Sequence, residues 1–294
     1  MAVGKDLAFI IGTGRCGTTM LAGILNAHSK ICVPHELQLI FEYGGNGPRL
    51  YELFLSKQQG AWNADDFARK IEELCPHDFK KYFNYHDFFF RQEYPIRDLS
   101  RLLSDLYREI AASRGKMFFL EQTPWYGQGI EILKGLFPDA KFIHMIRDGR
   151  DVALSFSRTP WWHDSPPENL ERWQREITKI SGDAELFLQK NQYLEVRYED
   201  FVRDPEKALR DIVDFLGVPF EREMLMPENL IDYFAFRRSD TRVISSEGYN
   251  AWAAGKDSAV FTESVFSWRK RPGGTFPRLS SEVRFALSKW GYEA

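Results

Sequence analysis

The feature that most constrains the fold is a glycine-rich segment between a short apolar run and a helical pattern. The run Leu7–Gly12 has the length of one buried strand, and Thr18–His28 has the apolar spacing of a helix. The connecting residues 12–19 read GTGRCGTT, a turn in which backbone N–H groups and a helix N-terminus can converge on an anion. This order predicts the first unit of a parallel α/β sheet with an anion site at its edge.

Three further apolar runs repeat the scheme of a strand followed by a helix. The predicted strands are Met117–Gln122, Lys141–Ile146 and Tyr193–Arg197, and the helices after them are Ile130–Phe137, Gly149–Ser157 and Glu206–Leu216. Asp204 is expected to cap the last helix, with Pro205 in its first turn. The alternation predicts a central parallel sheet flanked by helices, with ligands bound beyond the carboxyl ends of the strands.

Chain length and spacing predict one domain, residues 1–294, with two additions. About 80 residues of mostly helical pattern separate the first two predicted strands, too many for one crossover. We interpret residues 41–115 as an inserted helical subdomain on the acceptor side, and residues 221–277 as a C-terminal flap. The Phe- and Tyr-rich segment 77–94 is interpreted as packing the insertion on the sheet, with an aromatic acceptor pocket as the alternative.

Composition excludes several classes of protein. A net charge of −3 supplies no general attraction for nucleic acid, so any anion site must be local. Three cysteines, Cys16, Cys32 and Cys75, form neither an even disulfide framework nor a zinc pattern, which favours reduced thiols. No window approaches the roughly 18 apolar residues of a membrane span, and Leu7–Ile11 is too short for a signal sequence. We therefore expect a cytoplasmic protein without a membrane span.

The glycine-rich loop differs from a triphosphate-binding loop at a decisive position. Against the Walker A template it keeps both glycines and Thr19, but Thr18 stands where the lysine belongs and Arg15 is the available cation. No strand ends in a carboxylate suited to magnesium, since Lys141–Ile146 is followed by Arg147. A transferred group with a single negative charge needs less help from a metal, which favours sulfuryl transfer. An ordinary glycine-rich turn is the alternative.

The loop resembles the 5′-phosphosulfate-binding loop of sulfotransferases that use 3′-phosphoadenosine-5′-phosphosulfate (PAPS). Gly14 replaces a proline of that motif and Cys16 replaces a serine, which implies the loss of one hydroxyl contact. The resemblance assigns six loop residues to the donor: Gly14, Arg15, Cys16, Gly17, Thr18 and Thr19.

A second anion motif follows the third predicted strand. Arg147 and Ser155 can grip one phosphate through a guanidinium fork and a hydroxyl, although an Arg-Asp-Gly-Arg turn could instead pair its own charges. The stretch IRDGRDVALSF resembles the 3′-phosphate motif of the same family, in which an arginine and a serine take the places of Arg147 and Ser155. Both motifs together imply PAPS as donor and PAP, the adenosine bisphosphate, as product.

Two shorter segments agree with the resemblance, which covers residues 7–40 and 117–220, and a third, looser match lies near the C-terminus. The sequence YLEVRYED is similar to a family strand and implies that Tyr198 lies at the donor site. The sequence EQTP resembles a family Glu-Lys-Thr-Pro, with Gln122 in the lysine position. The segment SWRKRPGG resembles a flap that brings Arg269 or Lys270 to the 3′-phosphate, although a solvated basic run is the alternative.

Transfer requires a base for the acceptor proton and a donor for the charge on the leaving oxygen. The candidate base is Glu36, which lies in a Pro-x-Glu sequence that resembles the base motif of tyrosylprotein-type members. His35 is the first alternative as base, and Arg15 is the candidate for stabilising the leaving oxygen. We expect in-line transfer without a metal to a hydroxyl or amine of a small apolar or aromatic acceptor. His86 and His163 are interpreted as packed or half-exposed. A P-loop nucleoside or nucleotide kinase and a non-catalytic nucleotide-binding module are the rival functions.

Overall fold

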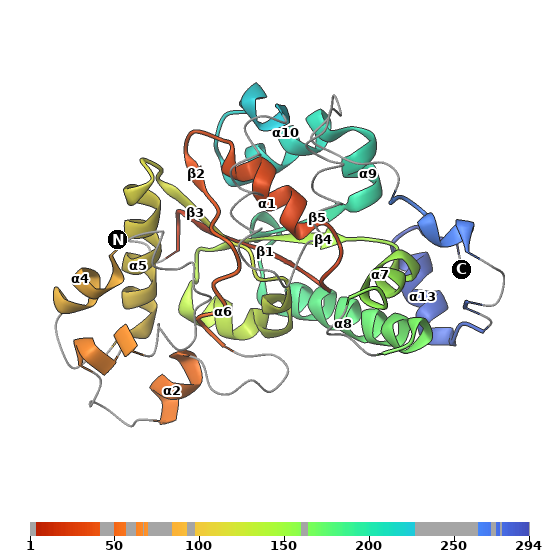
Figure 1. The fold of residues 1–294 in the computed structure, drawn as a ribbon, viewed down its shortest axis with the longest axis horizontal. Helices are drawn as coiled ribbons and strands as arrows, with labels where there is room; N and C mark the ends of the chain where they lie inside the picture. Colours follow the sequence, from red (N-terminus) through yellow and green to blue (C-terminus); the bar gives the residue numbers. More distant parts are fainter. Residues whose placement is uncertain are drawn as a thin grey trace.

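Five parallel strands form the centre of the molecule (Figure 1). The computed structural model describes residues 4–41, 50–56, 63–66, 68–69, 84–92, 98–159, 164–226, 264–271, 275–276 and 278–293. Within them the strands are β1 Leu7–Gly12, β2 Ile31–Cys32, β3 Phe118–Glu121, β4 Lys141–Ile146 and β5 Tyr193–Arg197, in the order β2-β3-β1-β4-β5. The α/β class predicted from the sequence is confirmed.

The strand order reverses between β1 and β4, and candidate residues leave the sheet at this point. We name the region outside the carboxyl ends of these two strands the crevice. The chain fills one side of β1 with β2 and β3, then crosses to the other side with β4 and β5. Gly12 at the end of β1 lies opposite Met145 of β4. The glycine-rich loop and Arg147 therefore leave neighbouring strands at the topological switch point, where ligands of such sheets bind.

The predicted strands are confirmed, and the short elements were missed. β1, β4 and β5 have the predicted bounds, and β3 is shorter by one residue at each end. β2 was not predicted because two residues carry no periodicity, so the long connection after β1 contains a strand that pairs with β3. Tyr198 begins a short helix, α9 Tyr198–Arg203, which the sequence analysis had treated as the end of a strand motif.

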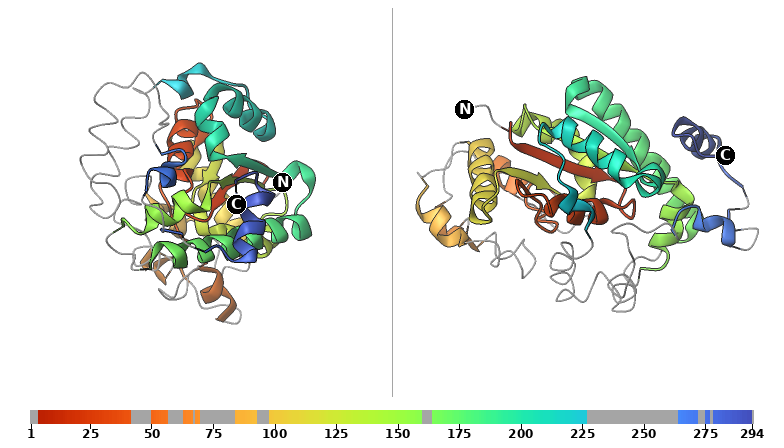
Figure 2. Two further views of the ribbon diagram at one scale, coloured as in Figure 1. Left: turned by 90° about the vertical axis from the view of Figure 1, so that its right-hand side faces the viewer. Right: turned by 90° about the horizontal axis from the view of Figure 1, so that it is seen from above.

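Helices cover both faces of the sheet. On one face lie α1 Thr18–Asn26, α9 and α10 Pro205–Leu216, and on the other lie α6 Ile130–Leu136 and α8 Pro166–Phe187 (Figure 1). The predicted cap of α10 is confirmed, because the Asp204 carboxylate accepts the Lys207 N–H at 3.1 Å. α7 Gly149–Phe156 follows β4, and α13 Ser281–Lys289 lies at the opposite end of the molecule from α4 Tyr85–Phe90 and α5 Leu99–Ser113 (Figures 1 and 2).

Two hydrophobic cores follow from the alternation of side chains along β1. Ala8 and Ile10 belong to the core under α1 and α10, and Phe9 belongs to the core under α5 and α6. Burial of one such side chain contributes about 1.5–3 kcal/mol.

Aromatic residues of the insertion enter the second core, which also contains α2 residue Leu50 (α2 Leu50–Ser56). Tyr85, Phe88 and Phe89 are buried there with sheet residues. Three aromatic residues of segment 77–94 are therefore buried as packing residues, whereas Phe90 of the same helix is exposed. His86 stacks on Tyr85 at the surface, with ring centroids 4.5 Å apart.

Several predictions fall outside the described residues, including Cys75, His163 and most of the predicted flap. In the part of the chain that is described, no helix combines the length and apolar character needed to cross a membrane.

Candidate functional site

The glycine-rich loop forms a left-handed turn at the N-terminus of α1. Gly14, Arg15 and Gly17 have φ angles of 74°, 54° and 97°, and Gly17 is the residue immediately before the helix. A Cβ at Gly17 would lie 2.6 Å from the Tyr198 ring, so no larger residue fits without movement. Such a turn gathers backbone N–H donors and the positive end of the helix dipole, which suits a phosphate or sulfate group.

Cys16 occupies the position at which the related motif has a serine. Its side chain is fully buried in the core, and burial raises the pKa of its thiol to about 11. Its sulfur lies 2.6 Å from the position that a Cβ on Gly12 would occupy. The side chain therefore packs in the core, close enough to Arg147 for its charge to act on the thiol, and the predicted loss of one hydroxyl contact to the donor stays a prediction.

The two predicted anion motifs meet in space. The Arg15 guanidinium donates from Nε to Ser155 Oγ at 3.0 Å, and Arg147 Nη1 donates to the Arg15 carbonyl at 3.0 Å. The Arg147 guanidinium also lies 4.5 Å above the Tyr198 ring. The structure thus brings together Arg15, Arg147, Ser155 and Tyr198, which the sequence had assigned to one ligand.

The alternative interpretation of the Arg-Asp-Gly-Arg turn holds for one of its arginines. Arg150 forms a two-pronged pair with Asp148, at 2.9 Å and 2.8 Å, and both side chains are buried. Arg147 instead approaches Asp151 at 3.9 Å. Arg150 therefore braces the turn, while Arg147 remains at the crevice.

A C-terminal segment, residues 264–271, lies across this crevice; we name it the strap. Arg147 Nη2 donates to the Ser264 carbonyl at 2.7 Å. Asp151 accepts the Ser267 hydroxyl at 2.7 Å and the Trp268 N–H at 2.9 Å, and the Trp268 indole donates to Asp148 at 3.1 Å. The strap is therefore held at the start of α7 by two carboxylates.

The basic residues of the strap lie on its exposed side. Arg269 pairs with Glu293 at 2.6 Å, and Lys270 is exposed. The helical turn at Ser267–Lys270 directs Trp268 inward, where the Arg150 guanidinium lies 3.8 Å above its ring, and the next two side chains outward. That Arg269 or Lys270 joins Arg147 at the 3′-phosphate stays a prediction.

Arg158, which the sequence analysis missed, and Arg271, from the segment SWRKRPGG, add positive charge. Burial and then the charge of Arg271 lower the pKa of Arg158, and Arg147 acts on it in the same direction. Arg158 belongs to no motif, so only its position identified it. Repulsion among these guanidinium groups would be relieved by a bound anion.

A single side chain, Gln122, connects the candidate base Glu36 to the glycine-rich loop. Glu36 is half-buried, and its Oε1 accepts the Gln122 amide at 3.3 Å. The same amide nitrogen lies 3.4 Å from Oγ1 of Thr18, the first residue of α1. Gln38, a residue that no motif signalled, donates to Glu36 Oε2 at 3.2 Å. His35 is half-buried beside Glu36, and Thr19 is half-buried on α1.

A second carboxyl group, Glu121, is enclosed behind the loop that carries Glu36. It is fully buried, accepts the Thr123 hydroxyl at 2.9 Å and accepts the backbone N–H of Leu37. Burial, with a further contribution from the charge of Glu36, raises the pKa of Glu121 to about 8. A protonated carboxylic acid at neutral pH therefore supports this loop.

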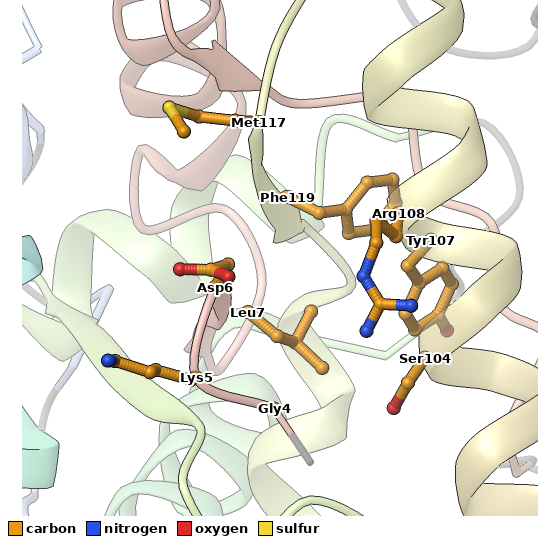
Figure 3. A pocket seen from close by; sticks show the side chains of 9 residues that line it. All are labelled: Gly4, Lys5, Asp6, Leu7, Ser104, Tyr107, Arg108, Met117 and Phe119. Carbon is orange, nitrogen blue, oxygen red and sulfur yellow. The ribbon is translucent and has the colours of Figure 1, made fainter. Parts of the chain in front are cut away.

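The cavity in Figure 3 lies at the opposite edge of the sheet. Its lining includes three side chains of α5, those of Ser104, Tyr107 and Arg108 (Figure 3). They lie towards Leu7, the first residue of β1, and Phe119, the second residue of β3. Its volume of about 30 Å³ suits a water molecule and not a nucleotide. Among the described residues, no group of three or more His, Cys, Asp or Glu side chains is placed to hold a metal ion.

Comparison with known proteins agrees with this geometry. A model of the sulfotransferase family matches residues 8–222. The chain is 27% identical over 232 residues to protein-tyrosine sulfotransferase A of Caenorhabditis elegans, covering 76% of this chain and 53% of that protein. It is 24% identical over 285 residues to nodulation protein NoeE of Sinorhizobium fredii, covering 90% of this chain and 60% of that protein. The chain thus spans little more than half the length of these relatives.

The fold is similar to that of solved sulfotransferase domains. The domain from the Synechococcus PCC 7002 olefin synthase superposes with a TM-score of 0.65 at 24% identity, covering 98% of this chain and 95% of that one. The domain from the curacin biosynthetic pathway gives a TM-score of 0.64 at 19% identity, covering 100% and 99%. With the family model matching well over half of the residues, this chain belongs to the sulfotransferase family.

Proposed function

We propose that the chain transfers a sulfuryl group from PAPS to an acceptor hydroxyl. The observation that carries the proposal is the convergence of Arg15, Ser155 and Arg147 at the crevice between β1 and β4. Two anion-binding segments far apart in the chain form one continuous surface there, as a donor with phosphate at both ends requires. Family membership supports the same donor.

Each segment has a distinct role in the proposal. The turn at Gly14–Gly17 and the N-terminus of α1 hold the 5′-phosphosulfate end through backbone N–H groups. Arg147 and Ser155 hold the 3′-phosphate, with the Tyr198 ring against the Arg147 guanidinium. These residues fit PAPS by their chemistry, since they offer hydrogen-bond donors and positive charge.

Glu36 acts as the base and Arg15 stabilises the leaving group. The acceptor oxygen forms a bond to sulfur while the bond from sulfur to the bridging oxygen of the donor breaks, and the acceptor proton passes to Glu36. The Arg15 guanidinium offsets the negative charge that develops on the bridging oxygen. His35, half-buried beside Glu36, is the alternative base.

The acceptor proposed is a phenolic or other hydroxyl compound. Aromatic residues such as Trp125, 3.9 Å from the Cβ position of Gly14, lie beside the loop and favour a flat or apolar acceptor. The relatives named protein-tyrosine sulfotransferases make a tyrosine side chain of a protein one source of this chemistry. A small phenol, tested in parallel with a tyrosine-containing peptide, distinguishes the two sources.

Calorimetric titration combined with a turnover assay tests the donor and the function. We expect PAP to bind equally well with magnesium and with EDTA, ATP to bind more weakly, and PAPS to be consumed with a phenol or peptide acceptor. Magnesium-dependent ATP binding would indicate a kinase instead. PAP binding without turnover on any acceptor would indicate a binding module.

Glu36→Gln separates chemistry from binding in the same assay. Turnover should fall by roughly 100-fold or more, the usual contribution of a general base, while PAP affinity stays unchanged. Turnover at the wild-type level would remove Glu36 from the mechanism and direct attention to His35.

A further inference from the structure

The Glu36 carboxylate is held between two neutral amide side chains from different parts of the fold. Gln122, at the end of β3, donates to Oε1 at 3.3 Å, and Gln38, in the loop after β2, donates to Oε2 at 3.2 Å. With each oxygen accepting a separate N–H, rotation of the carboxylate plane would break at least one hydrogen bond. The contacts therefore fix the direction in which Glu36 presents its lone pairs.

Gln38, which contacts Glu36, has a backbone conformation that is unfavourable for glutamine. Its φ of 52° lies in the left-handed region, which glycine and asparagine tolerate better than glutamine. The other two non-glycine residues with positive φ are Arg15 in the glycine-rich loop and Phe266 in the strap, so all three in the described chain border the candidate site. Strained residues persist where surrounding structure and function require them.

Gln122 joins the base to the donor-binding loop. It is 1% exposed, and its amide nitrogen lies between Glu36 and Thr18, 3.4 Å from the Thr18 hydroxyl at the start of α1. Its Oε1 is buried with no hydrogen-bond partner among the described residues, so the amide is oriented by its N–H contacts alone.

We propose that Gln38 and Gln122 are positioning residues that clamp the Glu36 carboxylate at a fixed distance from the glycine-rich loop. This rests on the proposed role of Glu36 as base. A neutral amide orients a carboxylate without the positive charge by which an ammonium group weakens its attraction for a proton. Gln122, as a neutral amide, therefore orients the carboxylate without this effect.

Two single variants test the clamp. Gln38→Gly removes the amide and relieves the left-handed strain, so thermal stability should stay equal or rise while kcat falls roughly ten-fold. Gln122→Met keeps the volume but removes both hydrogen bonds, and kcat should again fall roughly ten-fold with PAP affinity unchanged within about two-fold. A matched control is Gln128→Met, which removes an amide contact to the Glu176 carbonyl at 3.4 Å without touching Glu36.

Introducing each change into a Glu36→Ala background separates positioning from a general structural effect. If the glutamines act through Glu36, they lower kcat in the wild type but not further in Glu36→Ala. Equal losses in both backgrounds, or losses matched by Gln128→Met, would overturn the clamp. If Glu36→Ala keeps wild-type turnover, the proposed base is overturned. If Glu36→Ala loses turnover while both glutamine variants keep it, only the clamp is overturned. Melting temperature and PAP affinity serve as independent readouts for every variant.

Discussion

At the scale of single residues, environment divides the tasks of two neighbouring carboxyl groups. Glu36 is half-buried and accepts hydrogen bonds from amide side chains. Glu121 is fully buried and accepts the backbone N–H of Leu37, the residue after Glu36. Burial raises the pKa of Glu121 to about 8, so the enclosed carboxyl group stays protonated at neutral pH.

Glu121→Gln should change how stability depends on pH. The pKa of Glu121 is raised from 4.5 to about 8 in the folded state. Between these values the folded chain binds a proton that the unfolded chain has lost, so the free energy of unfolding falls as pH rises, by at most about 1.4 kcal/mol per pH unit. Below this window both states are protonated and the loss is absent.

Glutamine resembles the protonated acid. In Glu121→Gln the free energy of unfolding should therefore fall much less as the pH rises. Urea unfolding between about pH 5 and pH 8.5 measures it. Glu131→Gln, at an exposed glutamate of α6, is the control and should preserve the wild-type slope. An identical slope in Glu121→Gln would mean that Glu121 does not retain its proton.

Arg147→Ala should weaken PAP binding about 10- to 100-fold, the loss expected for a charge-assisted hydrogen bond, and Ser155→Ala should weaken it by a smaller factor. Isothermal titration measures both constants. Arg203→Ala removes an exposed arginine that pairs with Asp200 at 3.3 Å on α9, and PAP affinity should not change. Equal affinities for all three variants would exclude the Arg147 crevice as the phosphate site.

At the scale of elements, the strap depends on a small number of hydrogen bonds to α7. Ser267 and Trp268 donate to Asp151, and the Trp268 indole donates to Asp148. With the Arg147 contact to Ser264 and the packing of Phe266 on the core, these bonds hold a surface element, which opens at a lower free energy than a strand of the central sheet.

Ser267→Ala should increase the rate at which trypsin cleaves after Arg269 and Lys270. Loss of a hydrogen bond to a carboxylate costs about 1.5–3 kcal/mol, so the open form should become roughly 10- to 100-fold more populated. Mass spectrometry of early fragments locates the cleavage. Ser281→Ala, at an exposed serine that donates to Glu282, is the matched control; cleavage equally fast in both variants would show that Ser267 does not hold the strap.

At the scale of the whole molecule, the ligand crevice joins segments from both halves of the sheet. The glycine-rich loop follows β1, Arg147 follows β4, and the strap arrives from near the C-terminus. A ligand that contacts all three should therefore stabilise the fold as a unit.

Saturating PAP should raise the melting temperature. At about 100 times the dissociation constant the gain is about 2.7 kcal/mol, or roughly 5 °C for a chain of this size. Differential scanning calorimetry with EDTA or with magnesium measures the shift, which we expect to be the same in both. A shift that requires magnesium would contradict metal-independent binding of the donor.

Much of the fold follows from local patterns. Strands β1, β4 and β5 and the cap of α10 were predicted because apolar runs, turn residues and capping side chains act over a few residues. β2 and α9 were missed because they are too short to show a period, and pairing with β3 gives β2 its structure.

The class of sheet, the two anion motifs and the residues at its carboxyl edge could be predicted from the sequence, because periodicity, glycine positions and charge are properties of short segments. The folded chain was needed to show that Cys16 faces the core, that Arg269 turns towards Glu293, and that Gln38 and Gln122 meet at Glu36. Those outcomes depend on backbone dihedral angles and on contacts between segments distant in the chain, which no local pattern encodes.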